Sequence, residues 1–198
     1  MISMKKIFVA TNNAHKLEEI KDILNDFEIE AELLCPKDFN LIDEPIEDGL
    51  SFEENALIKA RYYYKIVNLP TIADDSGISI AYFNDHPGIH SARFLGDTSY
   101  GKKLNHILKL MEGVTNRDAR FNCVLAYIDE NGNEKTYHGQ IDGRIASNIR
   151  GSNGFGYDPI FCYGENDMTN AELPSGAKNE FSHRYIVLKK WIQDVKNK

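Results

Sequence analysis

Two adjacent carboxylates follow a short apolar run in the segment Thr71–Gly77, which reads Thr-Ile-Ala-Asp-Asp-Ser-Gly. If the run is a strand, successive side chains point to opposite faces, so only one of Asp74 and Asp75 can face a given site. Carboxylates this close together are costly unless a cation or hydrogen bonds satisfy them. The segment therefore fits a site at which a cation or hydrogen bonds satisfy the two acids. It also fits a turn after a strand, because Asp, Ser and Gly are common in turns.

A second stretch could bring positive charge to such a site. Lys5–Thr11 reads as a strand and is followed by apolar residues at helical spacing, so Thr11–Lys16 is the loop in which a helix begins. Asn12 or Asn13 can cap that helix. Its first N–H groups and its dipole favour an anion, and Lys16 would add a full charge. The loop lacks the glycines of a phosphate-binding loop, and on this stretch alone a solvated lysine is the simpler interpretation.

A third stretch is a helix predicted over Ser51–Val67, capped by its first residue with Glu54 reaching back. Lys59 falls on a stripe of this helix that carries small and apolar side chains. It could extend to the surface along its apolar stem, or it could point into a cleft shared with an anion. Glu47 and Asp48 stand just before the helix, and a solvated loop is the simpler interpretation for both.

Two further stretches fit ligand binding near the C-terminal end. The loop Arg150–Pro159 contains three glycines and two aromatic rings, so Phe155 or Tyr157 could stack on a flat ring, although a surface loop is the alternative. A last helix is predicted from about Lys178. The pair His183-Arg184 lies in its first turns, where the helix dipole opposes positive charge, so an acid or an anionic or keto-bearing ligand should compensate it.

The elements that would position these residues alternate in an α/β pattern. A helix capped by Asp97 and stopped by Gly113 carries apolar residues at helical spacing. An Asn-Gly pair in 129–133 predicts a hairpin. The further predicted strands are Glu28–Leu34, Ile78–Phe83, Ala119–Ile128 and Glu134–Ile141.

Composition limits the class of protein. The chain has 198 residues, of which 42% are hydrophobic and 27% charged, as expected for an ordinary soluble domain. The net charge of -7 argues against broad binding to nucleic acid, although clustered lysines can still hold a small anion. The three cysteines lie far apart and predict a reducing, cytoplasmic compartment. No apolar run approaches the length that spans a membrane.

Six stretches together resemble the inosine triphosphate pyrophosphatase family, which hydrolyses non-standard purine nucleoside triphosphates. In chain order they are Thr11–Lys16, Glu47–Arg61, Ala73–Gly77, Pro87–Arg93, Gly154–Pro159 and Lys178–Arg184. Any one of them is a weak signal. Their order and spacing cover nearly the whole chain, and this makes the resemblance specific.

The resemblance implies an α/β fold: an elongated mixed β-sheet flanked by helices, and two lobes with a nucleotide cleft between them. Residues 1–198 would form a single two-lobed pyrophosphatase domain. A Mg²⁺ cofactor and a homodimer are also implied. The expected partner is a small nucleoside triphosphate, with neither nucleic acid nor a membrane.

By position, the resemblance makes Asp75 the catalytic general base and a metal ligand. Glu47 would be the second ligand, and Asp74 is a further candidate. The implied substrate-binding residues are Thr11, Asn12, Asn13, Ala14, His15, Lys16, Lys59, Ser76, Phe155, Gly156, Tyr157, Asp158, Lys178, His183 and Arg184.

Two positions depart from the family pattern. The family often carries Gly where Asn12 and His15 stand, so the approach of this loop to phosphate can differ. Asp48 replaces the common Thr, which leaves the choice between Glu47 and Asp48 as metal partner open.

The implied reaction splits the bond between the α- and β-phosphates of ITP, dITP or XTP. The lysines would balance the triphosphate, and a metal held by the acids would lower the pKa of a bound water. His183 and Arg184 can donate hydrogen bonds to the keto oxygen at position 6 of hypoxanthine or xanthine. Adenine has an amino group there, and such a mismatch can be worth a factor of about 10⁴. Guanine shares the keto group, so its rejection is left unexplained.

Three alternatives remain on sequence grounds. A related pyrophosphatase that acts on dTTP, UTP or modified pyrimidines would share the acids and lysines and differ in the base pocket. A nucleotide-binding module without catalysis would have little need for Asp75 beside a second acid. A purely structural protein would have no reason to carry six ordered motifs.

Overall fold

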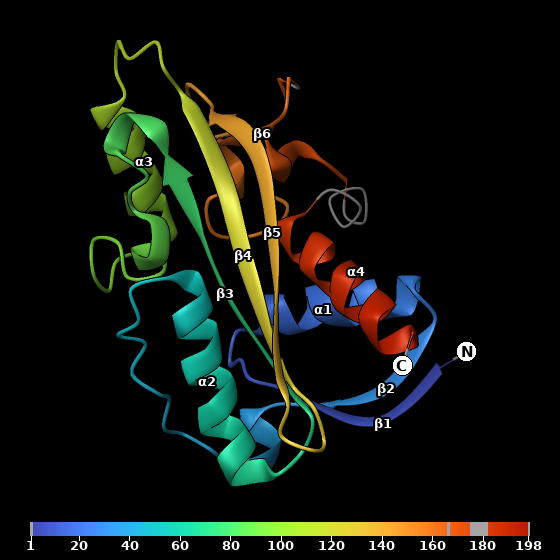
Figure 1. The fold of residues 1–198 in the computed structure, drawn as a ribbon. Coiled ribbons are helices and arrows are strands. Elements are labelled where there is room, and N and C mark those ends of the chain that lie inside the picture. The colour runs from blue at the N-terminus through green and yellow to red at the C-terminus, as the bar shows by residue number, and fades with distance from the viewer. Residues whose placement is uncertain (1, 166, 175–181, 198) are drawn as a thin grey trace. The chain divides into compact units, whose positions relative to one another are not determined.

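The computed structural model describes residues 2–165, 167–174 and 182–197. The strands are β1 Ile2–Val9, β2 Ile29–Leu34, β3 Thr71–Ile80, β4 Asp118–Ile128, β5 Glu134–Ile145 and β6 Phe161–Tyr163. The α-helices are α1 Ala14–Asp26, α2 Phe52–Val67, α3 Tyr100–Leu110 and α4 His183–Lys196. The sheet order is β2-β1-β3-β4-β5-β6 (Figure 1). Because β1 runs parallel to β2 and β3 whereas β5 and β6 are antiparallel, the predicted mixed α/β sheet is confirmed.

The chain divides into two compact units. Unit 1 contains Met1–Asp75, Cys123–Gly139 and Arg184–Lys198, and unit 2 contains Ser76–Asn122 and Gln140–His183. The strands β3, β4 and β5 each contribute one end to each unit, and the division within β3 falls directly after the two aspartates.

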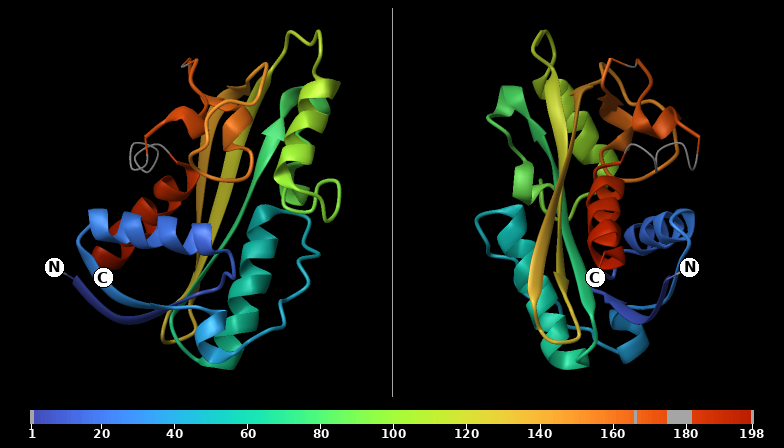
Figure 2. Two further views of the ribbon diagram at one scale, coloured as in Figure 1. Left: turned by 180° about the vertical axis from the view of Figure 1, so that it is seen from behind. Right: turned by 45° about the vertical axis from the view of Figure 1, so that its right-hand side comes forward.

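In unit 1 the strands bury both faces. One cluster packs the strands against α1 and α4, and the other packs them against α2, as Figure 2 shows for the two sides of the sheet. Neighbouring residues go to opposite clusters because side chains alternate along a strand. Ile7, Val9 and Ile72 belong to the first cluster, and Phe8, Ala10 and Ala73 to the second. Asp74 and Asp75 are the next two residues of β3, so the alternation continues into the acidic pair.

Unit 2 has its own buried side chains. Leu104 and Ile107 of α3 are buried, and so is Ile78 of β3. Phe121 and Phe161 have ring centroids 4.5 Å apart, which joins β4 to β6. These contacts give unit 2 an aromatic and aliphatic core.

Local sequence signals located several element ends. The Asn13 side chain caps α1 by accepting from the N–H groups of His15 and Lys16, and the Ser51 hydroxyl caps α2 by accepting from the Glu54 N–H. The Glu54 carboxylate reaches back as predicted, but it accepts from the Leu50 N–H rather than from the cap residue. The hairpin at 129–133 is also confirmed, since the Asp129 N–H donates to the Asn133 oxygen.

Several predicted bounds were wrong. The segment Ile78–Phe83 is not a separate strand, because β3 runs unbroken to Ile80 and is followed by a 3-10 turn at Ala81–Phe83. Ser99 rather than Asp97 stands at the start of α3. The short strand β6 was missed, since three residues are too few for a pattern. The predicted start of the last helix at Lys178 lies outside the described residues.

Candidate active site

Asp74 and Asp75 lie inside β3, so the interpretation of this segment as a turn is wrong. Asp74 is 3% exposed and Asp75 is 7% exposed. Following the alternation of Ile72 and Ala73, they point to opposite faces of the sheet in unit 1. Each aspartate therefore has its own set of neighbours.

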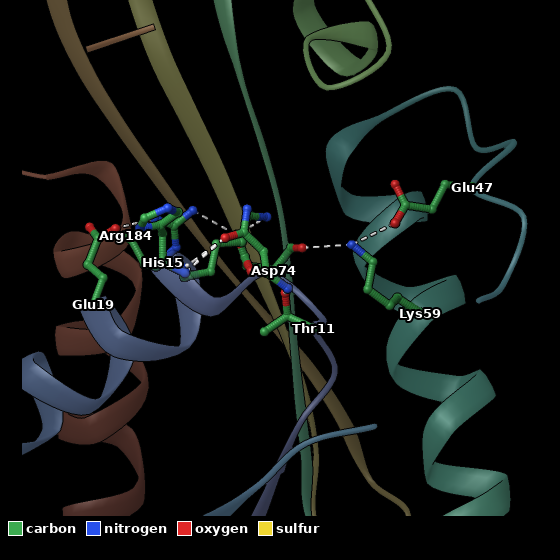
Figure 3. Close-up of polar contacts among 9 residues, drawn as sticks. Thr11, His15, Glu19, Glu47, Lys59, Asp74 and Arg184 are labelled. Carbon is green, nitrogen blue, oxygen red and sulfur yellow. Dashed lines mark hydrogen bonds and ion pairs between the residues drawn. The ribbon is translucent and has the colours of Figure 1, made fainter. Parts of the chain in front are cut away.

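Asp74 joins two cations on the side of α1 and α4. Its Oδ2 accepts from Lys16 Nζ at 2.9 Å and from Arg184 Nη2 at 3.0 Å. Arg184 Nη1 also donates to Glu19 Oε2 at 2.5 Å (Figure 3). Of the compensating groups predicted for the basic start of α4, an acid or a ligand, the structure shows two acids at Arg184.

The charges of Lys16 and Arg184 determine whether Asp74 is ionised. Burial alone would raise the pKa of Asp74, but the charges of Lys16 and Arg184 outweigh it and hold the pKa far below its ordinary value. Burial alone would lower the pKa of Arg184, but the carboxylates of Glu19 and Asp74 outweigh it and raise that pKa. Asp74 Oδ2 is thus shared by two cations, whereas Asp74 as a further candidate metal ligand stays a prediction.

Lys59 of α2 contacts the acidic pair from the opposite side of the sheet. Its Nζ donates to the main-chain oxygen of Asp74 at 3.0 Å and forms an ion pair with Glu47 Oε1 at 2.7 Å (Figure 3). Its side chain is 13% exposed. The interpretations of a surface lysine and a solvated Glu47 are therefore wrong. Asp48 is exposed, whereas Glu47 is held by Lys59.

Asp75 shares this side with Lys59, Glu47 and the amide of Asn55. Burial and the negative charge of Glu47 raise the pKa of Asp75 to about 6, although the charges of Lys59 and Lys16 act in the opposite direction. A buried carboxyl group with a raised pKa is poised to take up a proton near neutral pH. The same pair of carboxylates would be stabilised by a cation, which is the chemistry of a metal site.

The loop Thr11–Lys16 has a defined structure before α1. Thr11 Oγ1 accepts from the Asn13 N–H at 3.1 Å, and Asn12 Nδ2 donates to Glu44 Oε1 at 2.6 Å. The loop follows the carboxyl end of β1, which is where open α/β sheets bind ligands. It borders a cavity of about 610 Å³. The lining residues are Thr11, Asn12, Asn13, Ala14, Leu17, Cys35, Lys37, Asn40, Leu41 and Ile42.

The predicted base-binding residues belong to unit 2, where the structure gives several of them internal contacts. Tyr157 is buried, and its hydroxyl donates to the Ser91 oxygen at 2.7 Å, so stacking of a ligand is left to Phe155. The Asp158 carboxylate accepts from the Phe155 N–H at 2.9 Å and shapes the loop. His183 stacks on Phe121 with ring centroids 4.9 Å apart.

The structure thus sorts the predicted residues into two sets. Unit 1 brings together Lys16, Lys59, Glu47, Asp75 and Arg184. Unit 2 holds Ser76, the loop 155–158 and His183. The predicted ligand Lys178 lies outside the described residues. Sequence reasoning missed Glu19 and Asn55. Glu19 follows Lys16 by three residues and so shares its helix face, which is the signal that could have found it.

Gly77 follows the acidic pair in β3, and Gly88 and Ser91 lie against it. A Cβ at this position would lie 2.3 Å from the Gly88 oxygen and 2.5 Å from Ser91 Oγ. We expect Gly77→Ala to lower the free energy of unfolding by about 1–3 kcal/mol, since the crowding involves backbone. Urea unfolding measures this free energy.

Gly101→Ala in α3 is the control, because open space surrounds that position and alanine favours helix. Equal stability of Gly77→Ala and the unmodified chain would contradict the expectation.

Comparison with known proteins gives a consistent picture. The model of the Ham1 family matches residues 7–194. The chain is 43% identical to a dITP/XTP pyrophosphatase of Vibrio cholerae, with 97% of each chain covered, and 42% identical to one of Bacillus subtilis, with 96% of each covered. Among solved structures, a HAM1 protein from Coxiella burnetii superposes with a TM-score of 0.87 at 37% identity, covering 98% of this chain and 100% of that one. The Ham1 protein of Staphylococcus aureus gives 0.86 at 33%, covering 97% and 98%.

Proposed function

The chain belongs to the Ham1 family, and on that basis we propose that it hydrolyses non-standard purine nucleoside triphosphates. The substrates are dITP, ITP and XTP, and the products are the nucleoside monophosphate and pyrophosphate. One observation carries the proposal: Asp75, with its pKa raised to about 6, shares unit 1 with Glu47 and with two lysines that can face a polyphosphate. Relatives that match nearly the whole chain are named for this activity.

The acids fit a magnesium ion that the substrate helps to bind. Within the described ranges, no three His, Cys, Asp or Glu side chains gather into a metal site. Mg²⁺ usually takes only one or two protein carboxylates and completes its shell with water and phosphate oxygens. The pair Glu47 and Asp75 meets that need, because the charge of Glu47 raises the cost of ionising Asp75 and a divalent cation would offset that cost. When bound, Mg²⁺ would activate water and offset charge on the phosphates.

The side chains of the protein have separate tasks in the reaction. Asp75 orients the attacking water and takes its proton, for which a pKa near 6 suits neutral conditions. Lys16 and Lys59 balance the negative charge that spreads over the phosphates as the α–β bond breaks. Asp74 holds Lys16 in place at 2.9 Å, and Glu47 holds Lys59 at 2.7 Å. Lys178 is a further proposed phosphate ligand.

Base selection is the second half of the proposal. His183 and Arg184 supply donors for a keto oxygen at position 6, and Phe155 supplies a ring face. A purine with an amino group at that position would set donor against donor and leave a buried group without its hydrogen bond. The ion pairs of Arg184 with Asp74 and Glu19 hold its guanidinium while no nucleotide is bound.

A substrate panel tests the proposal directly. Purified protein is incubated with ITP, XTP, dITP, GTP, ATP and dTTP, with and without Mg²⁺, and pyrophosphate is measured. We expect rapid release from the first three nucleotides, slow release from ATP and dTTP, and loss of activity when the metal is chelated. A preference for dTTP over ITP would favour a pyrimidine enzyme. Binding without turnover would favour a nucleotide-binding module.

Two properties complete the proposed picture. All three cysteines, Cys35, Cys123 and Cys162, are in the thiol form, as suits the reducing cytoplasm in which we place the protein. The homodimer implied by the resemblance is part of the same proposal. In the described part of the chain, no helix combines the length and apolar character needed to cross a bilayer.

A further inference from the structure

A buried lysine on α3 is not explained by the proposed reaction. Lys103 is 3% exposed and shares the core-facing side of α3 with Leu104 and Ile107. Its Nζ donates to the main-chain oxygen of Ala92 at 2.6 Å and lies 5.0 Å from the centre of the Tyr100 ring. Burying an ammonium group is costly, and an apolar side chain would fit a helix core more cheaply. The position of this charge therefore calls for a specific reason.

Tyr100 connects the lysine to the loop that we propose binds the base. Its ring meets the Tyr157 ring edge-on, with centroids 5.5 Å apart and an interplanar angle of 88°. It also packs on Gly156, where a Cβ would lie 3.6 Å from the ring. The lysine thus lies on a ring that packs directly against the loop.

The segment Gly88–Ala92 connects Lys103 and Tyr157 to β3 through hydrogen bonds. Ser91 Oγ accepts from the Ile78 N–H at 2.9 Å, two residues after Ser76. The Ser91 oxygen accepts from the Tyr157 hydroxyl, and the next carbonyl, that of Ala92, accepts from Lys103. Through the two consecutive residues Ser91 and Ala92 the segment is therefore bound to the strand, to the loop and to α3, all of them within unit 2.

We infer that Tyr100 and Lys103 are positioning residues that fix the loop Gly154–Asp158, and with it the ring of Phe155, for the purine of the substrate. The inference rests on the proposed function and deepens it by adding residues that act on the base rather than on the phosphates. The charge matters in two ways: the ammonium anchors a main-chain oxygen, and it stabilises the face of the Tyr100 ring. A methionine of similar length would keep the packing and lose both interactions.

The test compares a ligand that carries the base with one that does not. We expect Lys103→Met and Tyr100→Ala to raise KM for ITP and the inhibition constant of IMP about tenfold, a change of about 1.4 kcal/mol. The inhibition constant of pyrophosphate should stay unchanged. Lys103→Arg and Tyr100→Phe should restore IMP binding, since they keep the charge and the ring. Lys102→Met, an exposed neighbour on the same helix, is the matched control.

Hydrogen exchange provides a second readout that needs no substrate. In the nucleotide-free protein, the amides of 154–158 should exchange about tenfold faster in Lys103→Met than in Lys102→Met. Equal losses of IMP and pyrophosphate affinity, or unchanged IMP binding and exchange, would overturn the inference. Failure of the unmodified protein to hydrolyse ITP would instead refute the proposed function, and the exchange result would still show whether Lys103 holds the loop.

Discussion

Asp75→Asn should lower pyrophosphate release from dITP by roughly 10³-fold or more, because it removes both a proton acceptor and a metal ligand. The fold should be kept. Burial and Glu47 raise the pKa of Asp75 in the folded chain, which means that folding disfavours its charged form. At pH 7 the ionised carboxylate therefore opposes folding, and the neutral amide should leave stability equal or slightly higher. Activity and stability are expected to change in opposite directions, as is common at active sites.

The measurement is initial-rate pyrophosphate release at saturating Mg²⁺, together with urea unfolding of the same samples. Asp48→Asn is the matched control, since Asp48 is an exposed acid next to Glu47 and should leave both quantities unchanged. Turnover of Asp75→Asn within tenfold of the unmodified enzyme would remove Asp75 from its catalytic role. A large loss of stability would mean that the charge supports the fold.

Asp74→Asn, the same substitution one residue earlier, should lower the free energy of unfolding. Asp74→Asn removes the carboxylate that Lys16 and Arg184 share, and it leaves Arg184, 1% exposed, with Glu19. Breaking a buried ion pair from one side costs about 3–5 kcal/mol. The pKa of Asp74 is depressed in the folded chain, so its contribution is present above the ordinary carboxyl pKa and is lost as pH falls toward the folded value.

Urea unfolding at pH 7 tests this second expectation. Glu134→Gln is the control, because Glu134 pairs with Arg61 on the surface, with side chains 35% and 50% exposed, and such pairs contribute about 0–1 kcal/mol. Equal effects of Asp74→Asn and Glu134→Gln would show that the buried network does not support the fold. In that case Lys16 would have to be held by something other than Asp74.

Much of the fold could be read from local patterns, because the signals are physical and short-ranged. The helical spacing of α1, the caps at Asn13 and Ser51, and the hairpin at 129–133 each depend on residues within one turn of each other. The continuous strand β3 could not be read this way. Two buried acids and a glycine look like a turn until their distant partners are known.

The site was predictable in composition but not in pairing. Six ordered motifs named the lysines and acids, yet the patterns alone favoured solvated interpretations for Lys16 and Glu47 and left Lys59 open between the surface and a cleft. The partner of Lys16 is Asp74, 58 residues along the chain, and the partner of Lys59 is Glu47, 12 residues earlier in the loop before α2. Tertiary contact, not local propensity, decides whether such a charge is buried. Glu19 was missed for the same reason, since its partner Arg184 is 165 residues along the chain.

Each of the two lysines already has a carboxylate of the protein beside it: Lys16 has Asp74 and Lys59 has Glu47. In the proposed reaction, a polyphosphate that binds Lys16 and Lys59 would compete with these built-in counter-ions, and the competition would resume as soon as hydrolysis has shortened the substrate. On that proposal the protein carries its own displacing anions, which would favour the departure of pyrophosphate and help the site reset for another turnover.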